Sequence, residues 1–288
     1  MGHHYVPQQY LRAFAADAGC VAIWQYDRKA QTFCEKPAAI KNVLQPRAFY
    51  SPEDETKLGE LVEKPANIVM RKILNGDYSL DNAERSALSL YMLTMIKRVP
   101  KFRQKGEAVA PGVLTKVVSE TKEVIDELNR LGRIDSAVAS RRMDELNAFE
   151  EKFKNELPEE IQSQMRSPWP SFELVTIVHN MDWQLVAAPD GEFFVTSDNP
   201  MFFFESFGLG NPESEFTFPI SSKMAIFGFR SGSVKLRSPV ISKPFVREAN
   251  RRIISAATQF VMSCRRDEWI SMMAKNRNLH LSQIRWMA

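Results

Sequence analysis

The sequence contains few cysteines and no long apolar run. Only three of its 288 residues are cysteine, namely Cys20, Cys34 and Cys264, and none of them forms a CxxC pair. An odd number without close pairs argues against a disulfide framework and against a thiolate zinc site. No apolar run reaches the roughly 18 residues that span a bilayer, and no basic start followed by an apolar stretch marks a signal peptide. We therefore expect a cytoplasmic protein with no membrane partner.

The signatures of several enzyme classes are absent as well. The chain contains no GxxxxGK[ST], no GxGxxG after a strand, no HExxH and no GxSxG. These absences disfavour P-loop nucleotide hydrolases, dinucleotide dehydrogenases, zincins and α/β-hydrolases.

Charge does not identify a partner by itself, because the net charge is only +3. Basic residues do cluster in several places, at residues 97–98, 101–105, 141–142, 251–252 and 265–266. Such clusters are typical of solvated helix faces, and the alternative is a phosphate-binding surface assembled from several of them.

Hydrophobic periodicity predicts an α+β fold with a large helical middle. Residues 21–28 and 32–36 are typical of a hairpin, and strand-like runs return after Asp182. Between them the pattern is helical, with a bend expected at Pro65 and a central apolar helix that ends at Pro100. We expect one domain over residues 1–288, with a helical insertion at residues 80–180. One antiparallel or mixed sheet should combine the N-terminal hairpin with the C-terminal strands.

Two segments of this fold carry more specific expectations. The run WQLVAAPDGEFFVTSD, residues 183–198, predicts a hairpin that turns at Pro-Asp-Gly. Residues 113–157 predict a pair of polar helices with thin apolar stripes. This helical hairpin should be the least buried and most mobile part of the chain, and it is the segment we nominate for homo-oligomer formation.

The chain begins MGHHYVPQQYLRAFA, with two histidines directly before Tyr5. Imidazoles suit zinc, nickel, iron or manganese, and one or two carboxylates would complete a site for a divalent metal ion. Alternatively one histidine acts as a general base while the other holds an anion. In the plainer interpretation, His3 and His4 only form hydrogen bonds, as we expect of His179 inside an apolar helix.

A second polar motif is TSDNP, residues 196–200, which follows a buried apolar run. A proline-enforced stop at a strand end would hold Asp198 and Asn199 with little freedom, as functional carboxylates often require. The structural alternative is strong, because Ser-Asp-Asn-Pro is also favourable turn chemistry. Glu63 is a further isolated acid, for which a solvated helix position is the alternative.

Together the two motifs resemble those of a widespread, mostly prokaryotic family known as domain of unknown function 4238. Further landmarks occur in a similar order, namely Glu63, Arg98-Val99-Pro100, Met181 to Trp183, Pro219 to Ser221 and Asn250. The positions that match the two motifs are His3, His4, Tyr5, Gln8, Arg12, Ser197, Asp198 and Asn199. The resemblance implies no activity, since the family has none assigned, but polar residues dominate both motifs. We therefore expect both motifs to converge on one site.

Two functions from different classes follow. The first is a metal- or histidine-dependent hydrolase acting on phosphodiester bonds of nucleic acid, a nuclease of the kind found in toxins or phage defence. Its catalytic residues would be His3, His4, Asp198 and Asn199, with His3, His4 and Asp198 as the metal ligands. Its substrate-binding residues would be Tyr5, Gln8, Arg12, Arg98 and Ser197. The second is a non-catalytic binding module whose motifs are structural. An open pocket that joins His3 or His4 to Asp198 favours the enzyme, and full burial with every polar atom bonded favours the module.

Overall fold

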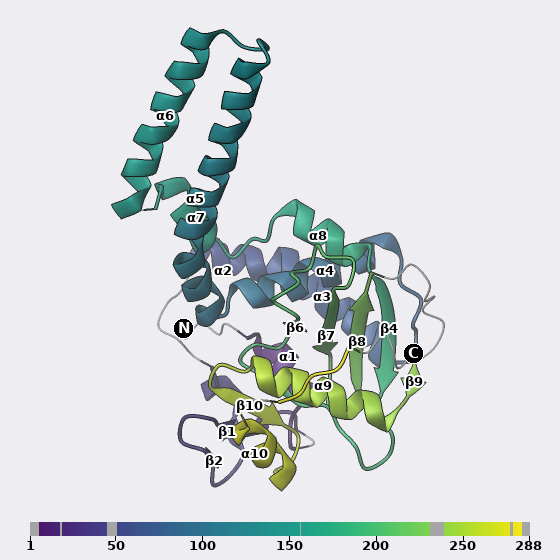
Figure 1. Ribbon diagram of the computed structural model, residues 1–288. Helices are drawn as coiled ribbons and strands as arrows, with labels where there is room; N and C mark the ends of the chain where they lie inside the picture. The colour runs from purple at the N-terminus through teal and green to yellow at the C-terminus, as the bar shows by residue number, and fades with distance from the viewer. Residues whose placement is uncertain are drawn as a thin grey trace. The chain divides into compact units, whose positions relative to one another are not determined.

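A computed structural model describes residues 6–17, 19–44, 51–155, 157–230, 239–276 and 279–283 of the protein (Figure 1). The chain divides into two compact units, one formed by Met1–Val99 with Pro168–Ala288 and the other by Pro100–Ser167. The second unit falls within the helical insertion predicted at residues 80–180. The structure thus places residues 80–99 and 168–180 with the first unit rather than with the insertion.

Most helices lie in the middle of the chain, with a short one near its start and two near its end. They are α1 (Gln8–Arg12), α2 (Pro52–Leu58), α3 (Lys64–Leu74), α4 (Asn82–Lys97), α5 (Pro100–Arg130), α6 (Ser136–Asn155), α7 (Glu159–Arg166), α8 (Phe172–His179), α9 (Lys243–Ala256) and α10 (Glu268–Lys275). A 3-10 turn, η1 (Ile40–Asn42), and a π-helical turn, η2 (Gly59–Glu63), complete the set. In the part of the chain that the structure describes, no helix is long and apolar enough to cross a membrane.

The strands form two sheets in the described residues. They are β1 (Ala22–Asp27), β2 (Thr32–Phe33), β3 (Ala38–Ala39), β4 (Asp182–Ala187), β5 (Thr196–Ser197), β6 (Phe202–Phe203), β7 (Glu215–Pro219), β8 (Met224–Phe229), β9 (Val240–Ile241) and β10 (Phe260–Ser263). The first sheet has the order β2-β1-β10-β5 with β3 beside β1, and the second has the order β6-β7-β8-β4-β9. The predicted α+β class with a large helical middle is confirmed, and the C-terminal strands are shared between two sheets instead of one.

The first sheet joins the two ends of the chain. Strand β1 pairs antiparallel with β10, from Trp24 opposite Ser263 to Asp27 opposite Phe260. Strand β10 also pairs with β5, which places Thr196 and Ser197 in the same sheet as the N-terminal hairpin. The expected union of the N-terminal hairpin with late strands is therefore present, and it positions the TSDNP motif.

The hairpin predicted for residues 183–198 was wrong. Strand β4 pairs instead with β8 along its whole length, from Asp182 opposite Phe229 to Ala187 opposite Met224. After the Pro-Asp-Gly turn the chain crosses to the first sheet, and the side chain of Asn250 takes the place of a neighbouring strand. Asn250 Oδ1 accepts from Val195 N at 2.9 Å, and Asn250 Nδ2 donates to Phe193 O at 2.8 Å. Hydrophobic patterning could not predict this arrangement, because the partner of residues 193–195 is a single side chain and not a strand.

The sequence predicted a bend at Pro65, and the structure has a π-helical turn, η2, that ends two residues before this proline. A proline has no N–H to donate and its ring clashes with the carbonyl four residues before it. The wider π turn gives that carbonyl room, so the helix continues through Pro65 into α3. Helix α4 then begins with a capping box between Asp81 and Glu84 and is buried along most of its length. Its predicted central position is confirmed.

The unit Pro100–Ser167 contains α5, α6 and α7. Helix α5 begins at Pro100 and continues through Pro111, whereas the sequence pattern predicted a start near residue 113. Among the described residues of the unit, the buried hydrophobic side chains are Val118, Ala139 and Phe153. The apolar stripes of this helical hairpin are therefore thin, as predicted. Its mobility stays a prediction.

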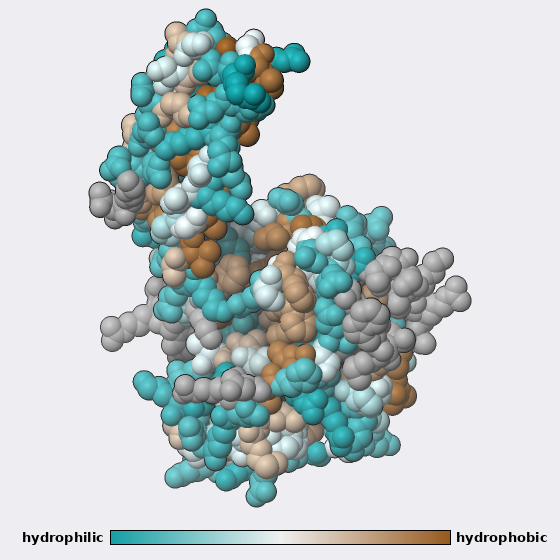
Figure 2. All heavy atoms as spheres, viewed as in Figure 1, coloured by the Kyte–Doolittle hydropathy of each residue, from teal (hydrophilic) through white to brown (hydrophobic). Residues whose placement is uncertain are grey.

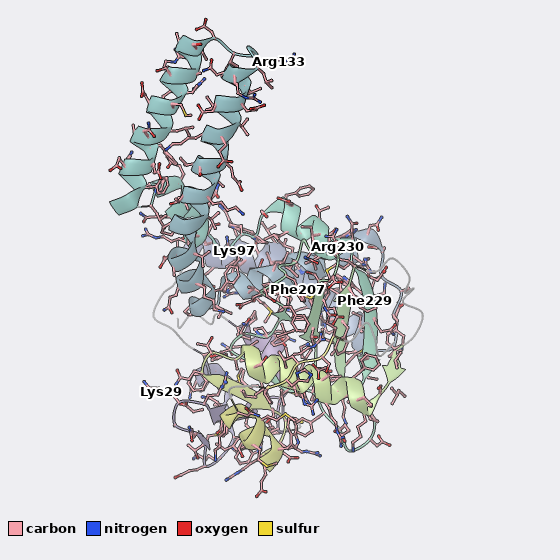
Figure 3. All side chains as sticks on the ribbon, in the orientation of Figure 1. Lys29, Lys97, Arg133, Phe207, Phe229 and Arg230 are labelled. Carbon is pink, nitrogen blue, oxygen red and sulfur yellow. The ribbon has the colours of Figure 1, made fainter. Side chains whose placement is uncertain are left out.

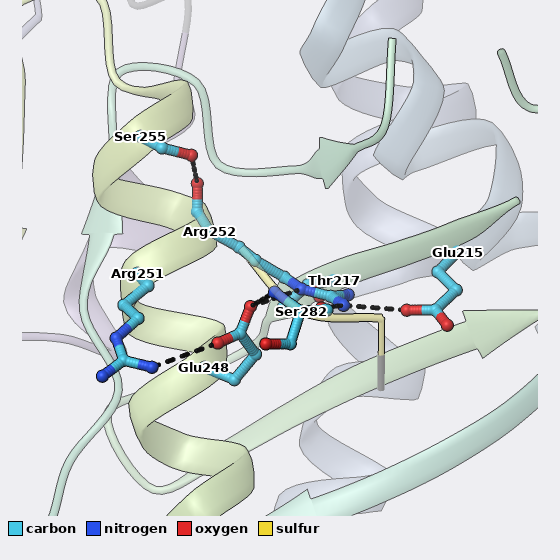
Figure 4. A network of polar contacts seen from close by, with 7 residues as sticks. All are labelled: Glu215, Thr217, Glu248, Arg251, Arg252, Ser255 and Ser282. Carbon is cyan, nitrogen blue, oxygen red and sulfur yellow. Dashed lines mark hydrogen bonds and ion pairs between the residues drawn. The ribbon is translucent and has the colours of Figure 1, made fainter. Parts of the chain in front are cut away.

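A buried ionic network ties α9 to the second sheet (Figure 4). The fully buried Arg252 of α9 donates to Glu215 Oε2 at 2.8 Å and to Thr217 Oγ1 at 3.1 Å. It also lies 3.5 Å from Glu248 Oε1, which accepts from Ser282 N at 2.8 Å. The network therefore also fastens residues 279–283 near the end of the chain to α9.

Replacing Gly228 with alanine is expected to lower the free energy of unfolding by about 1–3 kcal/mol. A methyl group at Gly228 would overlap the ring of Phe216, which is itself buried and edge-on to Trp183 at 6.0 Å between centroids. Urea denaturation measures the change. The matched control is Gly112→Ala in α5, where no heavy atom lies within 4 Å of the new methyl group and no loss is expected. Equal stability of the wild type and Gly228→Ala would contradict the packing of this strand pair.

Candidate functional site

The structure describes the N-terminal motif from Val6 onward. His3, His4 and Tyr5 lie outside the described residues, so their predicted roles and their predicted proximity to Asp198 stay predictions. In the described part, Val6 and the apolar side chains of α1 are buried, Gln8 is half-buried and Arg12 is exposed. The N-terminal motif is thus anchored in the core from Val6 onward.

Tyr10 links the first motif to the second. Its hydroxyl is buried, donates to Pro219 O at 2.7 Å and lies 2.9 Å from Thr196 Oγ1. Because the single hydroxyl proton of Tyr10 goes to Pro219, Thr196 must donate in its own bond with Tyr10. Burial raises the pKa of Tyr10 above its ordinary value, so the hydroxyl stays protonated. The two polar motifs are therefore in contact, through Tyr10 and Thr196.

Asp198 is a buried carboxylate whose two oxygens both accept backbone hydrogen bonds. Oδ1 accepts from Thr258 N at 2.7 Å, and Oδ2 accepts from Gln259 N at 2.7 Å and Phe260 N at 3.1 Å. Burial raises the pKa of Asp198, while the three N–H groups and nearby Arg28 oppose that rise. The carboxylate holds the turn between α9 and β10, which is a structural task.

Ser197 and Asn199 form hydrogen bonds with each other within the turn. Ser197 Oγ donates to Asn199 O at 2.7 Å and accepts from Asn199 N at 3.1 Å, which is the turn chemistry expected for this sequence. Asn199 Nδ2 lies 3.4 Å from Ala256 O, and Asn199 Oδ1 is buried with no partner in the described part of the chain. The catalytic role predicted for Asp198 and Asn199 stays a prediction, but these contacts favour a structural role.

A second polar cluster surrounds Arg98, which caps the C-terminus of α4. We call Glu55, Glu63, Tyr91, Thr94 and Arg98 the Arg98 cluster. Arg98 Nη1 lies 2.6 Å from Glu63 Oε1, and Nη2 lies 3.5 Å from Glu55 Oε2. The Arg98 side chain is only 3% exposed, whereas those of Glu55 and Glu63 are 21% and 25% exposed. The cluster therefore has a buried cation beneath two acids that reach solvent.

The π-helical turn explains how both acids reach one arginine. Two α-helical turns take about 7.2 residues, so positions eight apart would diverge on an ordinary helix. A π turn adds about one residue to that repeat. Glu55 and Glu63 are eight residues apart, with η2 (Gly59–Glu63) between α2 and α3. The inserted turn therefore places both carboxylates on the face toward Arg98, and π turns are frequent at functional sites.

The Arg98 cluster also contains two buried hydroxyl groups that have no hydrogen-bond partner in the described part of the chain. Tyr91 Oη and Thr94 Oγ1 are inaccessible and accept or donate no hydrogen bond within the described residues. Burial raises the pKa of Tyr91, Glu63 and Tyr10 raise it further, and Arg98 lowers it. The ring of Phe218 contacts both tyrosines, at 5.5 Å from Tyr10 and 6.2 Å from Tyr91 between centroids. The cluster therefore adjoins the point where the two motifs meet.

Sequence reasoning identified part of this arrangement. Glu63 and Arg98 were singled out, but as an isolated acid and as a phosphate ligand, not as an ion pair. Glu55, Tyr91 and Thr94 were missed. Tyr91 and Thr94 follow the spacing of one helix face that also contains Arg98, which is the signal that could have found them. Nothing in the pattern predicted the π turn that recruits Glu55.

No three or more His, Cys, Asp or Glu side chains group as a metal site within the described ranges. The acids of the Arg98 cluster number two, so a divalent ion there would need further ligands. His3 and His4 are the histidines nearest in sequence to the buried Val6, and imidazole with carboxylate is a suitable ligand set. The metal ligation predicted for His3 and His4 stays a prediction, since both lie outside the described residues.

Comparison with known proteins places the chain in a family without assigning an activity. The family model described as "Protein of unknown function (DUF4238)" matches residues 2–267. Neither the curated proteins nor the solved structures contain a match to the chain. The matched span includes both polar motifs and every member of the Arg98 cluster, and it covers most of the chain. The chain belongs to the DUF4238 family.

Proposed function

We propose that the protein is a hydrolase of phosphodiester bonds in nucleic acid, with the Arg98 cluster as its catalytic centre. One observation carries the proposal. Two partly exposed carboxylates flank a buried arginine, beside two buried hydroxyls that have no partner among the described residues. A buried ion pair is weak support for stability, and unpartnered buried hydroxyls are costly, so such a cluster is better explained by a reaction than by packing.

The residues suit the chemistry of hydrolysis. Glu63 would take a proton from a water molecule whose oxygen attacks phosphorus, and a protonated histidine of the pair at His3 and His4 would donate a proton to the leaving oxygen. Arg98 would hold Glu63 in position, above the buried hydroxyls of Tyr91 and Thr94. A divalent metal ion held by the two acids and the other, neutral histidine would supply charge stabilisation at phosphorus.

Nucleic acid is the proposed substrate because Arg98 stands in a basic stretch of the sequence. Residues 97–105 contain five lysines and arginines and no acid. Positive charge that neutralises several phosphates provides most of the sequence-independent affinity for nucleic acid. This proposal transfers the catalytic carboxylate from Asp198 to Glu63, since three backbone N–H groups already occupy the oxygens of Asp198.

The test compares cleavage of labelled RNA and DNA, single-stranded and duplex, with Mg²⁺, with Mn²⁺ and with a chelator. Glu63→Gln is expected to slow cleavage about 100-fold or more, the usual contribution of a general base. The amide keeps the shape of the side chain and a hydrogen bond to Arg98, so the fold should persist.

The matched control for this test is Glu60→Gln. Glu60 is an exposed acid in the same π turn, and its variant should cleave at the wild-type rate. His4→Ala should also lose activity while melting within a few degrees of the wild type. Full activity of Glu63→Gln, or no cleavage of any substrate by the wild type, would refute the proposal.

A second candidate is a non-catalytic binding module whose motifs lock the fold together. The saturated carboxylate of Asp198 favours it, as do the structural bonds of Tyr10 and Asn250. A module of this kind would bind labelled nucleic acid in a gel-shift assay without cleaving it. Binding should then be insensitive to Glu63→Gln and should weaken as salt is raised.

A further inference from the structure

We propose that two copies of the protein associate antiparallel through α5. The contact surface is a row of exposed apolar side chains on this helix and on Leu131, the residue directly after it, which we call the α5 stripe. Its members and exposed fractions are Val109 (60%), Val113 (53%), Val117 (51%), Val124 (57%) and Leu131 (56%). The surface lies wholly within the unit Pro100–Ser167 and does not depend on the proposed catalytic function.

The α5 stripe lies along one face of the helix. At about 100° per residue, its five members fall within about 80° of one another. Val118, one position beyond Val117, is instead buried within the unit, so the stripe is separate from the face that packs inside the hairpin. Figure 2 shows hydrophobic side chains between hydrophilic ones on the surface of this hairpin. The stripe is therefore a row of exposed valines and a leucine, interrupted by Glu120 and Glu127, with no covering element in the described structure.

Valine is an unusual choice for an exposed helix position. Its branched side chain loses rotamer freedom in a helix, so it forms helices less readily than alanine, leucine or lysine. Coiled coils, in contrast, use valine and leucine at intervals of four and seven residues. Val113 and Val117 are four apart, and Val117, Val124 and Leu131 are successively seven apart. This spacing fits a partner helix of about 33 Å, the length of the stripe.

The charges of α5 identify the partner as a second copy in antiparallel orientation. Residues 100–116 carry four basic side chains and one acid, whereas residues 117–130 carry four acids and two basic side chains. Glu120 and Glu127 lie within the stripe itself by their helical position. An antiparallel pair places each basic half against an acidic half, which is a self-complementary twofold contact. A parallel pair would place like charges together.

Sedimentation velocity of the full chain tests association. The wild type is expected to form a dimer whose dissociation constant rises with salt, because opposite charges steer and hold the contact. The double variant Val117→Asp with Val124→Asp is expected to dissociate at least about 30-fold more readily, since each aspartate would be buried without a partner. The control is Val138→Asp on α6, which is 43% exposed outside the stripe and should dimerise as the wild type does.

Circular dichroism of each variant excludes loss of the helices as the cause. A wild type that remains monomeric at the highest soluble concentration would overturn the proposal. A dimer that the double variant leaves intact would overturn it equally.

Energy transfer between dyes tests the orientation. Dyes on Gln104 of one copy and Arg133 of another should transfer efficiently, because Arg133 lies at the end of the hairpin where α5 turns into α6 (Figure 3). Dyes on Gln104 of both copies should transfer poorly, since opposite ends of α5 are more than about 40 Å apart along the helix. The reverse pattern would show a parallel pair and would overturn the antiparallel assignment.

Discussion

Replacing Arg252 with methionine is expected to lower the free energy of unfolding by about 3–5 kcal/mol, the usual loss when one partner of a buried ion pair is removed. The Arg252 side chain is fully buried, and those of Glu215 and Glu248 are only 2% and 3% exposed. The variant takes away the cation that both acids share. The partly exposed Arg251 still lies 3.5 Å from Glu248 in the variant, measured from Nη1 to Oε2. Glu215, in contrast, loses its contact with Arg252. Urea denaturation followed by circular dichroism measures the loss.

Two further variants make this test specific. Arg251→Met removes an arginine that is 44% exposed and should cost less than about 1 kcal/mol. The pair Arg252→Met with Glu215→Leu removes the cation together with its closest acid and should recover part of the loss, because apolar residues of similar size often replace buried ion pairs well. The Phe202 and Phe204 rings lie 5.4 and 5.1 Å from the guanidinium, so an apolar side chain fits there. Equal stability of Arg252→Met and wild type would contradict the network.

Replacing Asp198 with alanine is expected to lower the free energy of unfolding by at least about 3 kcal/mol. Three backbone N–H groups lose their acceptor, and bonds to a charged group contribute about 1.5–3 kcal/mol each before solvent compensates. The turn between α9 and β10 would loosen, and β10 pairs with both β1 and β5. The control is Asp190→Ala in an exposed loop, where the change should stay within about 0.5 kcal/mol. Thermal melting gives a first comparison and chemical denaturation gives the magnitude.

The Asp198 variant also separates the two interpretations of the TSDNP motif. A structural aspartate loses stability when it is replaced, and any activity falls only with the folded fraction. A catalytic aspartate loses activity while the melting temperature stays within a few degrees. Glu63→Gln and Asp198→Ala should therefore differ in kind: the former should affect cleavage, and the latter should affect folding. If Asp198→Ala has the same melting temperature as the wild type, the structural role assigned to the three hydrogen bonds of Asp198 is wrong.

The sequence by itself determined the class of the fold and most of its elements. Apolar periodicity located the central helix α4, because an apolar run is local in the chain. The structure shows that this helix begins with a capping box at Asp81. The two β-rich runs that form β7 and β8 were recognisable for the same reason. Two polar motifs were also recognised as belonging together, and the bond between Tyr10 and Thr196 shows that they are in contact.

Only the tertiary structure decided the partners of these elements and the roles of their polar side chains. A strand pattern does not specify its neighbour, so the run after the Pro-Asp-Gly turn resembled a hairpin although β4 pairs with β8. The sequence around Asp198 is compatible with a catalytic role and with a structural role. The structural role is favoured by three backbone N–H groups, from a segment about 60 residues later in the chain, that donate to this carboxylate. Glu55 joins Arg98 because a π turn changes the helical repeat. Pro65 predicted an irregularity in this helix, but only the backbone hydrogen bonds of the structure show that it takes the form of a π turn.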